Sequence, residues 1–213
     1  MLKSETQIEF EKQLFYITDT ALTCVHFVRL IKEYQELKQQ ENLLVINYNI
    51  YFDCLYNTMS NYLLLELYKL FDTGPDCISI DKVKNFAFQN FDSIFPPYHD
   101  YSTIPKREFS ELSRDDLFTS VKCLCKKLKE PVLKIERIRN KGGLAHGMYP
   151  SFDGNIDFHD VEISLDYIVK IINIFTERYS NTWVDFYGYI KETATLKDLS
   201  KEYALLLESQ SNS

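Results

Sequence analysis

Glycine, proline and long apolar runs are scarce in this chain of 213 residues, and each shortage excludes a class of protein. Six glycines and six prolines are too few for the many tight turns of an all-β protein. The most apolar segment, residues 62–71, contains Glu66 and Lys69, so it is too short for a membrane span. Lys3 and Glu5 interrupt the first residues, so we expect no signal peptide, no membrane contact and a cytoplasmic location.

Positive charge is also in short supply, because 24 Lys and Arg face 31 Asp and Glu and the net charge is −7. A protein with this balance has no general attraction for polyanions, so nucleic-acid binding requires a local basic patch. Cysteine is limited to five residues, an odd number that indicates reduced thiols. Cys123 and Cys125 stand close together without a second pair, so we expect neither a zinc site nor another cofactor.

Apolar residues, which make up 45% of the chain, recur at spacings of three and four and therefore predict helices. Ser4, Ser113 and Thr195 each precede a Gln or Asp by three positions, a pattern typical of helix starts. Pro131 favours a kink or a break at Glu130. The expected long helices span residues 5–39, 43–71, 114 to the glycines at 142 and 143, and 161–189, and the short ones span 80–91 and 195–207.

The chain contains no internal repeat and no alternation of strands with helices. The expected fold is therefore all-α, an up-and-down helical bundle of four main helices with short extra helices. A length of 213 residues suits a single domain, which we place at residues 1–208. The polar end, residues 209–213, is expected to form a disordered tail.

One segment departs from this plain helical pattern, the stretch RIRNKGGLAHGMY at residues 137–149. Arg139 is permanently charged and presents a fork of donors that fits phosphate. His146 titrates near neutral pH and can take or give a proton, and Asn140 can orient a neighbour by hydrogen bonding. A base, a phosphate clamp and an orienting group suffice for metal-independent RNA cleavage, in which a 2′-hydroxyl attacks the adjacent phosphate.

The charge around this segment fits the same chemistry. Eight Lys or Arg residues and only two Glu residues lie from Lys122 to Lys141. This is the local basic patch that RNA binding needs, with Lys134, Arg137 and Lys141 as candidates for holding the RNA backbone. The alternative is structural: the lysines form a solvated helix face, the two glycines end a helix, and Arg139 lies near a helix C-terminus, where a cation is favourable.

The order of these residues resembles the signature of HEPN domains, in which an Arg and a polar residue precede a His. Four to six residues separate Arg from His in that signature, and six separate Arg139 from His146. The segment LELYKLFD at residues 65–72, with RNKGGLAHG farther on, is similar to the AbiU-type abortive-infection group of this family. The resemblance covers the order of the helices over residues 40–180.

The resemblance implies a helical homodimer that acts as a metal-independent endoribonuclease in a toxin or phage-defence system. Arg139 and His146 of both copies would then meet in a cleft that binds RNA, and an antitoxin would be a further partner. In some relatives a nucleotidyltransferase antitoxin modifies a Tyr two positions after the His. Met148 stands at that position here and Tyr149 follows it, which speaks against such regulation and leaves Tyr149 as a candidate for the cleft.

The second predicted helix carries a polar stripe at intervals of four residues: Asn49, Asp53, Asn57 and Asn61. Buried polar groups without partners cost about 1–3 kcal/mol each, so the stripe must meet water, another polar group or a cleft. One hypothesis places Asp53 and Asn57 in the cleft, where Asp53 pairs with Arg139 or orients His146. The alternative is a stripe that faces solvent or forms a structural hydrogen-bond network.

Two functions therefore remain open. The first is the endoribonuclease, with Arg139, Asn140 and His146 as catalytic residues. The second is a non-catalytic helical module that uses the same surface to bind nucleotide, RNA or a protein partner. An active site requires Arg139 and His146 to be exposed and to face each other, whereas a structural role requires one of them to be buried against its own chain.

Overall fold

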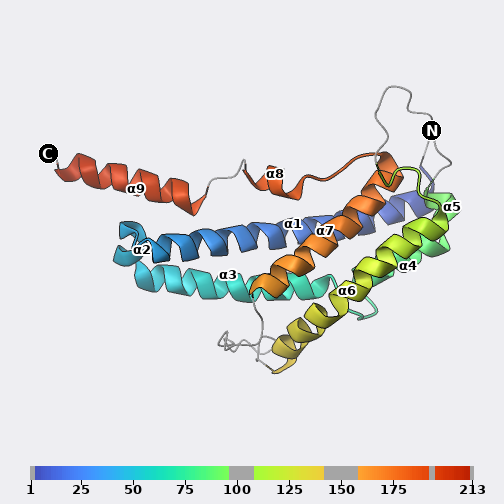
Figure 1. The fold of residues 1–213 in the computed structure, drawn as a ribbon, viewed down its shortest axis with the longest axis horizontal. Coiled ribbons are helices and arrows are strands. Elements are labelled where there is room, and N and C mark those ends of the chain that lie inside the picture. Colours follow the sequence, from blue (N-terminus) through green and yellow to red (C-terminus); the bar gives the residue numbers. More distant parts are fainter. Residues whose placement is uncertain (1–2, 96–107, 142–157, 192–194, 212–213) are drawn as a thin grey trace.

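The computed structural model describes residues 3–95, 108–141, 158–191 and 195–211, and gives the backbone alone at 137–141, 189–191 and 210–211. These residues form nine helices and no strand, so the expected all-α fold is confirmed. The four main helices are α1 (Glu5–Gln39), α3 (Asn49–Lys69), α6 (Arg114–Lys141) and α7 (Phe158–Ser180). The shorter helices, also drawn in Figure 1, are α2 (Leu43–Asn47), α4 (Ile80–Gln89), α5 (Phe91–Ile94), α8 (Phe186–Lys191) and α9 (Leu196–Ser211).

α1 is the central helix of the bundle, and α3 and α7 pack along it (Figure 1). Its start follows from a capping box, because Gln7 N donates to Ser4 Oγ at 3.2 Å and Ser4 N donates to Gln7 Oε1 at 3.0 Å. Of the helices in the described part of the chain, α1 alone is long and apolar enough to span a membrane. A core helix of a soluble protein and a signal sequence both pass the same test, and twelve of the 35 residues of α1 are buried here.

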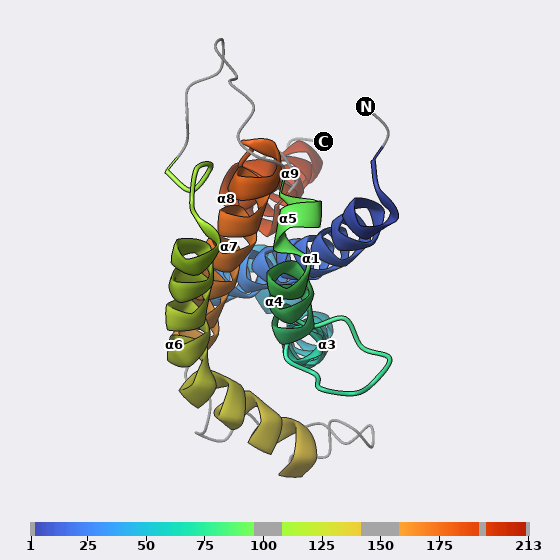
Figure 2. The ribbon, with the colours of Figure 1, turned by 90° about the vertical axis from the view of Figure 1, so that its right-hand side faces the viewer.

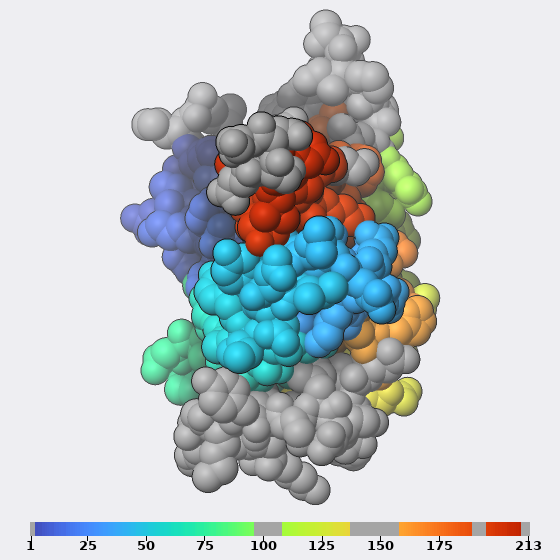
Figure 3. Space-filling model, turned by 90° about the vertical axis from the view of Figure 1, so that its left-hand side faces the viewer, coloured from blue at the N-terminus to red at the C-terminus, as the bar shows by residue number. Residues whose placement is uncertain are grey.

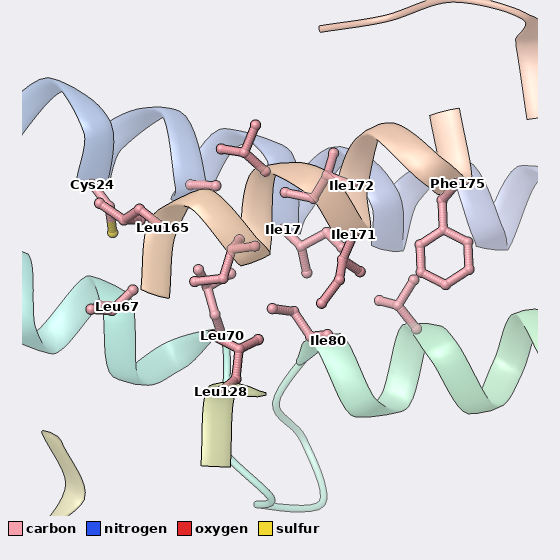
Figure 4. Packing of buried hydrophobic residues seen from close by; sticks show 14 of the residues in the cluster. Ile17, Cys24, Leu67, Leu70, Ile80, Leu128, Leu165, Ile171, Ile172 and Phe175 are labelled. Atoms are coloured by element: carbon pink, nitrogen blue, oxygen red, sulfur yellow. The ribbon is translucent and has the colours of Figure 1, made fainter. Parts of the chain in front are cut away.

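The core lies where α1, α3, α4, α6 and α7 converge (Figure 4). Each helix contributes large apolar side chains that are at most 3% exposed, among them Ile17 of α1, Leu67 of α3, Ile80 of α4, Leu128 of α6 and Phe175 of α7. Burial of such a side chain stabilises the fold by about 1.5–3 kcal/mol. The convergence fixes the middle of α6 beside the end of α3 and the start of α4.

The single helix expected over residues 43–71 was a wrong prediction, because the chain leaves the helical conformation at Tyr48, with φ −122° and ψ 32°. Asn42 caps the start of the short helix α2, and Asn49 follows directly after the break. Asn42 Oδ1 accepts Leu44 N at 3.1 Å, and Asn49 Oδ1 accepts Ile50 N at 2.7 Å. Side chains of this kind compete with helical hydrogen bonds, an effect that the apolar pattern does not contain.

Pro131 lies inside α6, and its effect is a bend without a break. The helix continues through the proline to Lys141, and Figure 2 shows its C-terminal part turning away from the direction of its first part. A proline removes one backbone donor and crowds the preceding turn, which explains the bend. The start of α6 is as expected, since Asp116 N donates to Ser113 Oγ at 3.2 Å.

The fourth long helix ends earlier than the apolar pattern predicts. α7 ends at Ser180, because Asn181 adopts a positive φ of 51° that closes the helix. Asn173 then holds the following chain, since its Oδ1 accepts Val184 N at 2.9 Å and its Nδ2 donates to Val184 O at 3.3 Å. The separate helix α8 begins only at Phe186.

α9 starts where the sequence predicts, with Asp198 N donating to Thr195 Oγ1 at 3.1 Å. It extends to Ser211 and so includes residues 209–211, which were expected in a disordered tail. Near its end Ser209 Oγ donates to the carbonyl oxygen of Leu206 at 2.8 Å.

The end of the molecule formed by α2, the start of α3 and α9 has its own small core and is seen face on in Figure 3. Glu33 of α1 ties α9 to this end, because its Oε2 accepts Leu196 N at 2.9 Å and its Oε1 accepts Arg29 Nε at 2.9 Å. The outer side chains are open to solvent, with Ile50 83% and Tyr51 65% exposed. Residues 43–52 carry no charge, so the part of this end that α2 and the start of α3 form is apolar, whereas α9 carries Lys197, Asp198, Lys201 and Glu202.

Candidate functional site

α6 carries most of the residues predicted for the site. Its helix continues to Lys141, so Arg139 and Asn140 occupy its last described turn. A cation in such a turn also suits the structural alternative, because it interacts favourably with the helix C-terminus. The side chains of Arg137, Arg139, Asn140 and Lys141, and the whole of His146 and Tyr149, lie outside the described residues. The pairing of Arg139 with His146 therefore stays a prediction.

Three lysines form an exposed ridge along α6: Lys122, Lys126 and Lys129. Their spacings of four and three place them on one face of the helix. Lys126 and Lys129 have no ion pair among the described residues, and Lys122 Nζ lies 5.9 Å from the centre of the Phe118 ring. This lysine ridge is a local positive surface on a protein whose net charge is −7.

The other lysines of α6 whose side chains are described face α7. Lys134 Nζ lies 2.7 Å from Asp160 Oδ2 in the first turn of α7 and 3.9 Å from Glu130 Oε1. Lys127 Nζ lies 5.3 Å from the centre of the Tyr167 ring. Lys134 was predicted to hold RNA, but here its charge is already matched by Asp160, so its first role is to join α6 to α7.

A hollow of about 230 Å³ lies between α6, the end of α3 and the start of α4. It is called the α3–α6 hollow below. Ten residues line it: Tyr68, Phe71, Thr73, Ile80, Asp81, Cys125, Leu128, Lys129, Val132 and Glu136. Tyr68 and Phe71 belong to the segment LELYKLFD, which the structure therefore brings against α6.

The α3–α6 hollow is one helical turn away from the predicted catalytic residues. Arg139 and Asn140 follow Glu136 by three and four positions in the same helix, and one turn rises about 5.4 Å. The lysine ridge reaches the other side of the hollow through Lys129. The backbone of α6 thus places a positive ridge, an aromatic hollow and the Arg139–Asn140 pair in that order.

The lining of the α3–α6 hollow combines apolar, aromatic and charged side chains. Burial raises the pKa of Cys125 to about 11, so its thiol is protonated and unreactive at neutral pH. Asp81 forms an ion pair with Lys84, and no histidine lines the hollow. Among the residues that the structure describes, no group of three or more His, Cys, Asp or Glu side chains is placed to hold a metal ion.

The polar stripe of α3 meets α1. Asp53 Oδ1 accepts hydrogen bonds from Tyr34 Oη at 2.5 Å and from Lys38 Nζ at 2.8 Å. The bond from Lys38, together with that from Tyr34, lowers the pKa of Asp53, whereas burial, followed by the bond to Asp53, raises the pKa of Tyr34. Asp53 thus belongs to a structural hydrogen-bond network, as the alternative interpretation holds.

The rest of the stripe gives no sign of a cleft. Asn49 and Asn57 are exposed, and Asn61 Oδ1 is shielded from solvent and has no hydrogen-bond partner among the residues that the structure describes. Asp53 also precedes Tyr68, which lines the α3–α6 hollow, by fifteen residues of helix or about 22 Å along α3. A contact between Asp53 and Arg139 has no support among the described contacts.

The residues that sequence reasoning missed are those that line the α3–α6 hollow. Tyr68, Phe71 and Val132 follow the helical spacing of ordinary core residues, so no local signal separates them from the core. Only the crossing of α3 and α6 reveals that they leave space between them. Comparison with family models, with curated proteins and with solved structures finds no match to this chain.

Proposed function

We propose that this protein is a metal-independent endoribonuclease of the HEPN kind, which acts in the cytoplasm as part of a toxin or phage-defence system. His146 serves as general acid and base, and Arg139 holds and polarises the scissile phosphate. Asn140 orients this pair. Arg137, Lys141 and the lysine ridge hold the RNA backbone, and Lys134 adds to them only when RNA displaces Asp160.

The observation that carries this proposal is the continuity of α6. One helix runs from the exposed lysine ridge, past the α3–α6 hollow, to Arg139 and Asn140 in its last described turn. A protein of net charge −7 repels RNA over most of its surface, so a local positive path that leads to a phosphate-binding arginine supports RNA as the ligand.

The reaction needs no group beyond this chain and the RNA. His146 accepts the proton of a ribose 2′-hydroxyl, and the 2′-oxygen attacks the adjacent phosphorus. Arg139 stabilises the charge that gathers on the phosphate oxygens. The bond to the 5′-oxygen breaks, that oxygen takes up the proton from His146, and the products carry a 2′,3′-cyclic phosphate and a 5′-hydroxyl.

The proposal includes a homodimer with the active site in a cleft between the two copies, and an antitoxin as a further partner. Support for self-association comes from residues 43–52, an uncharged segment at one end of the molecule. Five exposed apolar side chains of this segment leave roughly 600 Å² open if a fully exposed large side chain presents about 200 Å²: Leu43, Ile46, Tyr48, Ile50 and Tyr51. A standard interface takes about 800 Å² per partner.

RNA cleavage by the purified chain in EDTA tests the proposed function. Wild type should cut total RNA, and His146→Ala and Arg139→Ala should each lose activity by a factor of about 10² or more. Lys126→Ala, which removes only one ridge charge, should weaken binding and keep the cleavage pattern. Activity that disappears with the chelator, or that survives in His146→Ala, would overturn the proposal.

A second function is favoured by one observation, the character of the α3–α6 hollow. Its lining offers apolar and aromatic surface, and its one thiol, Cys125, is protonated at neutral pH. The chain would then be a non-catalytic helical module that binds nucleotide, RNA or a protein partner. RNA binding without cleavage, unchanged in His146→Ala, would identify that module.

A further inference from the structure

We propose that the α3–α6 hollow receives one unstacked base of a single-stranded RNA and prefers a base with an exocyclic amino group to uracil. The inference rests on the proposed function, because it places this base next to the phosphate that Arg139 holds. It adds a specificity site formed by residues of α3, α4 and α6 outside the segment 137–149.

The shape and the lining of the hollow suit a base. Its volume of about 230 Å³ exceeds the size of one nucleobase, and its walls include the rings of Tyr68 and Phe71. Val132 and the buried Leu128 supply apolar surface from α6. Aromatic side chains bind bases of single strands by stacking, and stacking is available only when the base has left a duplex.

The charges of the lining decide between a base and a phosphate. Asp81 and Glu136 bring two carboxylates to the hollow, where Asp81 is paired with Lys84 and Lys129 adds one further ammonium. The hollow therefore offers a phosphate no net positive charge, whereas the lysine ridge does, so we expect the backbone to follow the ridge and a base to turn inward. Carboxylates accept hydrogen bonds from exocyclic amino groups and repel the carbonyl oxygens of uracil.

The order of features along α6 fits one strand of RNA. Lys122 and Lys126 lead to Lys129 at the edge of the hollow, and Arg139 follows Glu136 by one turn of helix. A strand whose phosphates lie along this line presents a base to the hollow just before a phosphate reaches Arg139. Recognition of that base would choose which phosphate is cut.

Binding of oligocytidine and oligouridine provides the test, because the two bases differ in the amino group and have the same ring size. Fluorescein-labelled 2′-O-methyl oligonucleotides, which lack the attacking hydroxyl, would be titrated with the protein in EDTA and followed by anisotropy. Wild type should bind the cytidine strand about tenfold more tightly. Val132→Phe fills the hollow, so it should bind both strands with the weaker affinity that wild type shows for the uridine strand.

Leu133→Phe is the matched control, because it adds the same ring one position along α6, at a side chain that is 51% exposed. It should leave both affinities unchanged. Glu136→Gln keeps the shape of the side chain and should reduce the ratio of cytidine affinity to uridine affinity. It replaces Val132→Phe in the test if thermal melting shows that Val132→Phe is not folded.

The outcomes separate this inference from the proposed function. Equal binding of the two strands by wild type, or a preference that persists in both Val132→Phe and Glu136→Gln, overturns the hollow as a base site. Cleavage of RNA in EDTA that depends on His146 would then still support the ribonuclease. A protein that binds neither strand and cuts no RNA overturns both.

Discussion

Lys134 joins α6 to α7 beside the proposed RNA-binding surface, and its replacement separates a structural role from an RNA-binding role. Its ammonium lies 2.7 Å from Asp160 Oδ2, and the two side chains are 36% and 26% exposed. Exposed ion pairs contribute about 0.2–1 kcal/mol, and partial burial favours the upper end of that range. Lys134→Met should therefore lower the free energy of unfolding by about 1 kcal/mol.

Urea denaturation followed by circular dichroism measures this change, and thermal melting should fall by about 2–4 °C for a chain of this size. Lys126→Met is the matched control, because Lys126 is exposed on the same helix without an ion pair among the described residues. Its free energy of unfolding should change by less than about 0.5 kcal/mol. In a double-mutant cycle with Asp160→Asn, the coupling energy between the two residues should account for most of this loss of stability.

The same variants report on RNA binding. Log affinity for RNA falls linearly with log salt concentration, and replacing a residue that contacts a phosphate reduces the steepness of this slope by about 1. We expect this for Lys126→Met and a smaller effect for Lys134→Met, whose charge Asp160 already matches. The reasoning would be refuted if Lys134→Met kept the stability of wild type and its slope of log affinity against log salt were less steep by a full unit.

Three further predictions follow from the described contacts. Phe10 is fully buried against the rings of Phe95, Phe175 and Tyr179, so Phe10→Ala should lower the free energy of unfolding by about 3–5 kcal/mol in urea denaturation. Hydrogen bonds from Lys38 and Tyr34 lower the pKa of Asp53, so its ionised form stabilises the fold above the ordinary carboxyl pKa of about 3.9. This contribution is lost as the pH falls through the lowered pKa. Asp53→Asn should therefore reduce the dependence of the free energy of unfolding on pH in the acid range. The pKa of Cys125 is about 11, so iodoacetamide at pH 8 should alkylate it far more slowly than the exposed Cys54, as mass spectrometry of peptides would measure.

Each of these predictions has a matched control or a contradicting result. Phe15→Ala removes a ring that is 72% exposed and should cost less than about 0.5 kcal/mol. An Asp53→Asn variant whose acid unfolding matches wild type would show that the bonds to α1 contribute nothing. Equal alkylation of the two cysteines would contradict the burial of Cys125.

Local hydrogen bonds explain which parts of the fold could be predicted from the sequence. The starts of α1, α6 and α9 each depend on a side chain that caps the helix within three residues, and all three were predicted. The bend at Pro131 has an equally local cause, the missing backbone donor. These features require no knowledge of the rest of the chain.

The features that the sequence did not reveal depend on contacts between distant residues or on competition between neighbours. The break at Tyr48 lies beside Asn49, whose side chain accepts a backbone hydrogen bond from Ile50 inside an apolar pattern. The end of α7 depends on Asn173, which holds Val184 eleven residues later. The α3–α6 hollow depends on the crossing of two helices, so Tyr68 and Val132 were indistinguishable from core residues.

The measurement that tests the central claim most directly is cleavage, in EDTA, of an RNA whose cut position has been mapped. It would be compared with the same RNA carrying a 2′-deoxynucleotide immediately before the scissile phosphate. The account predicts that the ribose substrate is cut to a 2′,3′-cyclic phosphate and a 5′-hydroxyl, and that the deoxy substrate is not cut there. Equal cleavage of both substrates, or cleavage only with added metal, would contradict it.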